Sequence, residues 1–348
     1  MQHAIGAAPD PAHGYCVDDV ARALQVDLLH CRVLGWPAVA DSAHRGIRFL
    51  QDASRGAGGG FRNFRQMDGS WVAGRGSEDS QGRAMLALGE TIAAEPDPYV
   101  VDAASDLWAR SLPGAARPTA LRAHALIILG CVAVLSTRDG SLAATTLEDL
   151  ASRLLTRFRL EDSPGWPWPE PVLTYENALL PRALIEAGRA LDSKPMVETG
   201  LGALDWLIAV QAAPDGHLSP IGNGWWPRGG DRSRFDQQPI EATALLLASK
   251  SAFAATGDHR YAAVMEQAYG WFLGENDNRS QVADPALGAS FDGLTPTGVN
   301  ANQGAESTLM WLTAAEHIRA LRSATTLAVP VHPSPTAVAP QHLAASLG

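Results

Sequence analysis

The sequence predicts an all-α protein, an (α/α)6 toroid in which six helical hairpins form a ring. Three observations predict this fold. Ala and Leu dominate an apolar fraction of 46% while β-branched residues are sparse, a composition that favours helices. Helical apolar periodicity recurs along the chain in segments of roughly 15–20 residues. The connections between these segments alternate between short and long, as expected of helical hairpins placed side by side.

Eleven helical segments can be placed on the sequence. They cover residues 15–34, 38–53, 79–94, 98–111, 117–136, 141–159, 175–191, 194–211, 238–256, 258–273 and 303–322. A short connection such as 257–258 follows the first helix of a pair, and a long one such as 275–302 follows the second. Six hairpins need twelve helices, so one outer helix is not accounted for. An open solenoid is therefore the alternative to a closed ring.

The two helices of each pair differ in polarity. The first helices are apolar on nearly every side, as over 123–135, whereas the second are amphipathic, as over 261–272. A helix that is apolar all round is buried on all sides. We therefore expect the first helices to form an inner ring and the second an outer ring. The toroid is expected to span residues 1–324, followed by a flexible Pro/Ala-rich tail over 325–348.

Charge and composition exclude several classes of function. The formal net charge is −10 and no Lys/Arg run occurs, which argues against a nucleic-acid partner. The most apolar stretch, 121–135, contains Arg122 and His124 and is too short to span a membrane. The first ten residues lack the features of a signal peptide, so we expect a cytoplasmic protein. Neither the three cysteines nor the ten histidines show metal-ligand spacing, and no metal or cofactor is expected.

Carboxylates lie near the N-terminal ends of the predicted inner helices, which would meet at one mouth of the toroid. Candidates for a catalytic acid and base are Asp79 and Asp236, with Glu170, Glu241 and Glu306 as substitutes. An inverting glycoside hydrolase uses such a pair, one to protonate the leaving oxygen and one to activate water. Acids at helix starts also serve as caps, which is the alternative for each. That alternative explains Glu241 and Glu306 less well, because both lie beside Ala and Leu.

Other polar and aromatic residues of the same helix ends and loops are candidates for binding sugar. They are Tyr15, Asp18, Asp19, Glu78, Arg83, Trp166, Trp168, Tyr175, Glu176, His217, Trp225, Trp226, Arg234, Gln237, Gln238, Asn302 and Gln303. The tryptophans lie in Gly- and Pro-rich loops, and indole faces stack on sugar rings. The sequence thus predicts a Trp-lined cleft, with hydrophobic plugs for the toroid as the alternative role of these side chains.

Five motifs carry a resemblance to a known family. They are GYCVDDVARA at 14–23, GSEDSQGRA at 76–84, WPWPE at 166–170, FDQQPIE at 235–241 and NQGAES at 302–307. Together they resemble a bacterial family of six-hairpin proteins, of the (α/α)6 glycosidase type, found fused to or beside retaining-type glycosyltransferases. The resemblance covers residues 2–322. It implies a toroid, a saccharide ligand and a glycosyltransferase domain or neighbour as partner.

The function predicted from the sequence is hydrolysis of an oligosaccharide or glycoside by an inverting, carboxylate-based mechanism. Three alternatives remain open. A sugar phosphorylase would hold phosphate on Arg228, Arg232 or Arg234. A sugar epimerase or isomerase would need a histidine pair, which the inner-helix ends lack in the sequence. A non-catalytic glycan-binding module would serve a glycosyltransferase.

Overall fold

A computed structural model describes residues 3–56, 59–74 and 76–328, and this part of the chain contains eleven α-helices. They are α1 Val17–Leu34, α2 Trp36–Ala53, α3 Glu78–Ala94, α4 Pro98–Ala115, α5 Leu121–Leu135, α6 Ser141–Glu161, α7 Leu179–Ala190, α8 Lys194–Val210, α9 Pro239–Thr256, α10 His259–Phe272 and α11 Ala305–Ala328. The predicted all-α class is confirmed. Each predicted segment overlaps one of these helices.

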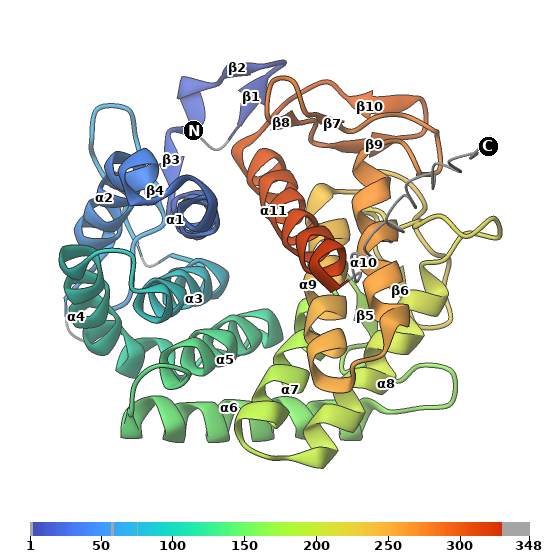
Figure 1. The fold of residues 1–348 in the computed structure, drawn as a ribbon, viewed down its shortest axis with the longest axis horizontal. Coiled ribbons are helices and arrows are strands. Elements are labelled where there is room, and N and C mark those ends of the chain that lie inside the picture. Colours follow the sequence, from blue (N-terminus) through green and yellow to red (C-terminus); the bar gives the residue numbers. More distant parts are fainter. Residues whose placement is uncertain (1–2, 57–58, 75, 329–348) are drawn as a thin grey trace, which may run out of the picture.

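The odd-numbered helices form a closed inner ring. Each of α1, α3, α5, α7 and α9 packs on the next one, and α11 packs back on α1 (Figure 1). The helices α2, α4, α6, α8 and α10 pack outside their inner partners. Contact between α11 and α1 excludes the open solenoid. Within the described residues the outer ring has five helices, and α11 continues through 325–328 of the predicted tail; residues 329–348 lie outside the described part.

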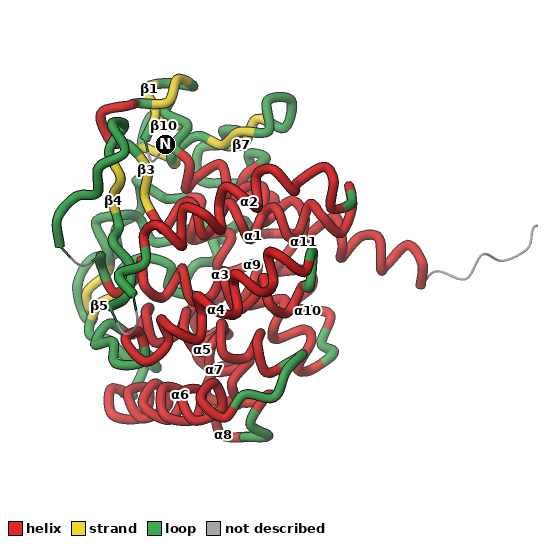
Figure 2. Tube along the Cα trace, turned by 90° about the vertical axis from the view of Figure 1, so that its left-hand side faces the viewer, coloured by secondary structure: helices red, strands yellow, loops and turns green. Residues whose placement is uncertain are grey.

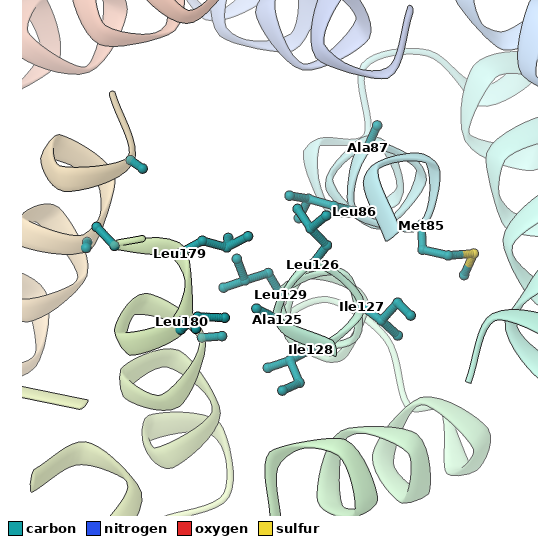
Figure 3. Close-up of a cluster of buried hydrophobic side chains, with 14 of the residues drawn as sticks. Met85, Leu86, Ala87, Ala125, Leu126, Ile127, Ile128, Leu129, Leu179 and Leu180 are labelled. Carbon is teal, nitrogen blue, oxygen red and sulfur yellow. The ribbon is translucent and has the colours of Figure 1, made fainter. Parts of the chain in front are cut away.

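The core lies between the two rings and between neighbouring inner helices. The side chains of α5 point in all directions and meet Met85 and Leu86 of α3 and Leu179 of α7 (Figure 3). The helices α3 and α5 approach closely at a pair of glycines. A Cβ on Gly89 would lie 2.5 Å from the Gly130 carbonyl oxygen, so a larger residue there would push the helices apart. The two glycines thus allow the buried helices α3 and α5 to pack closely in the inner ring.

Short strands and long loops gather at one end of the ring, where the inner helices begin (Figure 2). The strands are β1 Ala4–Ile5, β2 Ala8–Pro9, β3 Tyr15–Cys16, β4 Phe64–Arg65, β5 Val172–Leu173, β6 Trp226–Pro227, β7 Ala283–Asp284, β8 Ala289–Ser290, β9 Gly293–Thr295 and β10 Gly298–Asn300. They pair two by two as antiparallel ribbons, β1 with β2, β3 with β4, β5 with β6, β7 with β8 and β9 with β10. The pairs β3–β4 and β5–β6 join loops that are distant in sequence. No helix in the described ranges is long and apolar enough to cross a membrane.

Candidate functional site

A polar cavity of about 400 Å³ lies at the loop end of the ring; we call it the mouth cavity. Its lining comes from the N-terminal ends of α1, α9 and α11 and from the loops that precede α9 and α11. The residues are His3, Asp19, Arg22, Asn223, Asp236, Gln237, Gln238, Asp292, Gly293, Thr295, Asn300, Gly304, Glu306 and Ser307. Carboxylates, amides and hydroxyls dominate this lining. Such groups hydrogen-bond to the hydroxyls of a sugar.

Arg22 fixes two of the carboxylates in the wall of the mouth cavity. It is 3% exposed, and its Nη1 lies 3.0 Å from Asp19 Oδ1 while its Nη2 lies 2.5 Å from Glu306 Oε2. Burial raises the pKa of Asp19, although the positive charge of Arg22 opposes this shift. The salt bridges hold carboxylates of α1 and α11, distant in sequence, beside one another at the point where the ring closes.

Asp236 differs from these two because its carboxylate is exposed and has no hydrogen-bond or ion-pair partner among the described residues. It precedes α9 with a φ of +58°, a left-handed conformation that costs energy in a residue other than glycine. The segment that follows is held in place because Gln237 pairs with Leu294. At Gly293 a Cβ would lie 2.3 Å from the Gln237 carbonyl oxygen, so only glycine fits there. The strained backbone and the tight packing direct a free carboxylate to the cavity.

A second set of polar residues lies deeper and across the ring, outside the lining of the mouth cavity. Arg83 forms an ion pair with Glu176, and its Nε lies 3.7 Å from Asp18 Oδ1. The side chain of Glu241 is buried and accepts hydrogen bonds from the backbone N–H of Glu176 and from Asn177. Burial raises the pKa of Glu241 to about 7, against the effect of these hydrogen bonds.

Arg122 of α5 organises the neighbouring part of this deeper set. Its Nη1 lies 3.0 Å from Glu170 Oε2, and its guanidinium lies 4.6 Å from the centre of the Tyr175 ring. The hydroxyl of Tyr175 donates a hydrogen bond to Asp79. Glu78, next to Asp79, accepts hydrogen bonds at 2.7 Å from the two N–H groups that directly precede α5, those of Thr119 and Ala120. The structure therefore gives Glu78, Asp79 and Glu170 protein partners and leaves them outside the mouth cavity.

The tryptophans of the loops pack against one another and not into the mouth cavity. Trp166 and Trp168 are 4% and 0% exposed. Trp166 lies 5.3 Å from Trp206 of α8 and 5.2 Å from Trp226, measured between ring centres. Trp225 is exposed, with no place in the cavity lining. Tryptophan therefore does not line this cavity, and Trp166 and Trp168 are buried in a cluster with Trp206.

The remaining predicted residues of the loops are mostly bound to the protein itself. His217 Nδ1 lies 2.5 Å from Asp215 Oδ1, and Arg234 Nη2 lies 2.9 Å from Asp277 Oδ1. The Gln237 side chain contacts Asp277 as well. The three loop arginines do not share a site: Arg228 pairs with Glu161, Arg232 donates to the carbonyls of Val210 and Ser219, and Arg234 pairs with Asp277.

The N-terminal segment closes one side of the mouth cavity. Asn302 Oδ1 accepts a hydrogen bond of 3.0 Å from the Gly6 N–H, and the Gln303 N–H donates to the Gly6 carbonyl at 2.9 Å. These contacts anchor the β1–β2 hairpin beside α11. Tyr15 is partly exposed where β3 leads into α1. Asn302 and Gln303 thus shape the site by holding its wall.

Several lining residues were missed by sequence reasoning. His3 lines the cavity, and its ring centre lies 4.5 Å from that of His13. Asp292 lines it too, with its Oδ1 2.7 Å from the Gly304 N–H. The signal for Asp292 was its place in a Gly-containing loop before an inner helix. The histidine pair gives no sequence signal, because η1 (Pro11–His13) and the β1–β2 hairpin bring the two rings together.

Comparison with solved structures identifies the fold. The cellobiose 2-epimerase of Spirochaeta thermophila matches with a TM-score of 0.67 and 15% identity, over 93% of this chain and 90% of that one. A D-mannose isomerase matches at TM-score 0.64 and 12% identity, over 92% and 90%. The GH76 α-mannanase of Bacteroides thetaiotaomicron matches at TM-score 0.60 and 10% identity, over 90% and 88%. These similarities confirm the (α/α)6 toroid. No protein-family model and no curated protein sequence matches the chain.

Proposed function

We propose that the protein binds a saccharide in the mouth cavity and hydrolyses a glycosidic bond there. The observation that supports this most is the convergence of Asp236 and Glu306, both predicted from the sequence as catalytic carboxylates, in one cavity. Asp19 and Asp292 add two more carboxylates to the same wall. The (α/α)6 fold, shared with an α-mannanase and with sugar epimerases, is consistent with a sugar substrate.

In the proposed mechanism, Asp236 and Glu306 are the acid and the base. One carboxylic acid protonates the leaving oxygen, and the other carboxylate takes a proton from the water that attacks the anomeric carbon from the opposite face. The product then has the inverted anomeric configuration. Arg22 holds Glu306 in position, and the amides of Gln238 and Asn300 are placed to bind hydroxyls.

Asp79 takes a different role in this proposal. Its carboxylate accepts the hydrogen bond of Tyr175 and does not line the cavity. We therefore assign Asp79 a positioning role, in which it orients Tyr175 over Arg122. Glu170 and Glu241 likewise hold neighbouring groups.

A product screen tests the proposed function. The protein is incubated with α- and β-linked gluco- and manno-oligosaccharides, with and without inorganic phosphate, and the products are identified by mass spectrometry and NMR. Shorter sugars formed without phosphate, with turnover lost in D236N and E306Q, support hydrolysis. Turnover that requires phosphate indicates a phosphorylase, and a new sugar of unchanged mass indicates an epimerase or isomerase. Either result overturns the proposed hydrolysis.

Epimerisation is the second candidate because the structure places two histidines at the mouth. His3 lines the cavity and contacts His13, whose Nε2 lies 3.5 Å from Asp10 Oδ2. A histidine can remove and return a proton at a carbon next to a carbonyl. In that case H3Q abolishes isomerisation of a reducing sugar, whereas E306Q impairs it less. If H3Q leaves turnover unchanged, the histidine pair has no part in the reaction.

A non-catalytic module that binds glycan for a glycosyltransferase is the third candidate. It is favoured by the many ion pairs between acids and arginines, of Asp19 and Glu306 with Arg22 and of Glu170 with Arg122. Such pairs give rigid binding groups that do not need to exchange protons. Saturable binding of an oligosaccharide that is recovered unchanged from the screen identifies this function.

A further inference from the structure

A second cavity, of about 310 Å³, lies along the axis of the ring beyond Arg22 and Arg83; we call it the axial cavity. It is lined by inner helices and reaches Ala93 and Ala94 at the end of α3 and Ser136 just after α5. These lining residues lie at the C-terminal ends of α3 and α5, at the end of the ring opposite the loops (Figure 2). No predicted role in sugar chemistry uses this end of the molecule.

The far part of the axial cavity carries more positive than negative charge. Arg32, Arg182 and Lys250 line it together with His317. Among the described residues no carboxylate oxygen lies within 4.0 Å of a side-chain nitrogen of these three cations. The lining contains one carboxylate at this depth, Glu90, which accepts a hydrogen bond of 2.7 Å from Gln25. The cations thus face the cavity without direct counterions.

Arg182 shows most clearly that this arrangement of cations is electrostatically unfavourable. It lies in the first turn of α7, where the positive end of the helix dipole disfavours a cation. Its Nε is buried and has no hydrogen-bond partner among the described residues. A buried donor without a partner costs free energy. An anion in the cavity would relieve both costs.

The shifted pKa values of His317 and Lys250 show that the positive charges lie near one another. Burial and the charges of Lys250, Arg182 and Arg32 lower the pKa of His317 to about 2, so this histidine is neutral at neutral pH. Burial, with the charges of Arg182 and Arg32, lowers the pKa of Lys250, while Glu90 and Glu186 oppose the shift. Outside the lining, Glu186 is itself paired with Arg189.

We propose that the axial cavity binds a small oxyanion of the phosphate class through Arg182, Lys250 and Arg32. An arginine presents paired donors that match the oxygens of phosphate, and a lysine adds a compact charge. The cavity is larger than inorganic phosphate, so it also has room for a phosphoryl group attached to a small sugar. The proposal does not depend on the reaction at the mouth.

Isothermal titration calorimetry of the full chain with inorganic phosphate tests this proposal, with a hexose phosphate and the unphosphorylated hexose as parallel ligands. R182Q and K250Q are compared with R189Q, a control on the same helix whose arginine pairs with Glu186 outside the cavity. We expect phosphate to bind the wild type and R189Q alike, and its affinity to fall about tenfold or more in R182Q and in K250Q. R234Q, at the loop end, should bind phosphate as the wild type does.

Comparison of the hexose phosphate, inorganic phosphate and the hexose shows whether the cavity binds a phosphorylated sugar or the free anion. Tighter binding of the hexose phosphate than of phosphate, with no binding of the hexose, means that the cavity takes a phosphorylated sugar; equal binding means that it takes the free anion. Absence of phosphate binding by the wild type overturns the proposal. So does unchanged affinity in K250Q and R182Q, with their folding confirmed by circular dichroism. If R182Q does not fold, K250Q alone decides, because Lys250 keeps part of its surface exposed and has no hydrogen bond or ion pair with the described residues that the substitution would break.

Discussion

The mouth cavity and the axial cavity have opposite electrostatic character although α1, α9 and α11 contribute to both. At the mouth, Asp19, Asp236 and Glu306 lie in or just before the first turns of α1, α9 and α11. The axial cavity, which extends toward the other end, is lined by Arg182 and Lys250. Acids at helix starts are favoured by the helix dipole, so some of the mouth acidity is expected of any toroid. The exposed, unpaired Asp236 and the buried Nε of Arg182 are not explained by that effect, and they indicate function at each end.

The largest effect is expected from removing the unpaired carboxylate of the mouth. D236N should lower turnover of the sugar substrate by about 10²–10⁴-fold, because a carboxyl group that transfers a proton contributes about that much. Stability should change little, since the side chain has no protein partner. D231N, in the same loop and also exposed, is the matched control. Similar rates for D236N and D231N would remove Asp236 from the mechanism.

Breaking the salt bridges of Arg22 that join α1 to α11 at the mouth should cost stability. R22Q leaves Asp19 and Glu306 without their cation, and loss of one partner of a buried ion pair costs about 3–5 kcal/mol. Urea unfolding measures this change. R319Q, which removes an exposed pair with Glu316, serves as the control and should unfold near the wild-type midpoint. If R22Q unfolds at the same urea concentration as the wild type, the carboxylates of Asp19 and Glu306 are positioned by other contacts.

A substitution in the tryptophan cluster distinguishes a structural role of these side chains from a sugar-binding role. W168A should lower the free energy of unfolding by about 3–5 kcal/mol, because Trp168 is fully buried beside Phe158 of α6. The KM of the folded variant should equal that of the wild type. A large rise in KM at unchanged stability would restore the sugar-binding role predicted for Trp168 from the sequence.

Glu241 should make stability depend on pH. Its pKa is about 7 in the folded protein against an ordinary value of 4.5, so the folded state holds the proton more tightly. Stability is therefore highest below the ordinary value and falls as the pH rises through about 7, by about 3 kcal/mol in all. E241Q should flatten this slope in urea unfolding series at several pH values. A slope equal to that of the wild type would show that Glu241 ionises at its ordinary pKa.

The smallest effect is expected at Asp79. D79N keeps an oxygen that can accept the hydrogen bond of Tyr175, so turnover should fall by less than about tenfold. Y175F removes the donor of the same hydrogen bond, and the turnover measured by steady-state kinetics should fall by a similar factor. A loss in D79N as large as that in D236N would return Asp79 to the catalytic pair predicted from the sequence.

Much of the fold could be predicted from the sequence because the signals were local. Apolar periodicity located the helices, and the all-round apolarity of α5 marked it as an inner helix. Closure of the ring was predicted from the buried first helices, but no local pattern contains the contact that closes it, that of α1 with α11, the first and last helices. The tail was predicted to start at 325, but α11 continues to Ala328 because nothing in its sequence stops a helix before Pro330.

The sequence located acidic residues at the starts of inner helices, whereas the grouping of their side chains depends on tertiary structure. Acids at inner-helix starts were found, and Asp236 and Glu306 indeed share a cavity. The partners of the other acids could not be predicted, because Arg83 forms an ion pair with Glu176 across the ring and Arg122 forms one with Glu170, each between residues distant in sequence. The tryptophans lie in loops as predicted, but the loop between α6 and α7 packs against the loop between α8 and α9. Their burial follows from tertiary contacts that no local pattern contains.

The most direct test of the mouth cavity as the sugar site is a crystal structure of D236N with the oligosaccharide that the wild type cleaves. We expect the sugar to lie in the mouth cavity, with its scissile bond between residue 236 and Glu306 and its hydroxyls bound by Gln238 and Asn300. A sugar bound elsewhere, with the mouth cavity empty, would contradict this account.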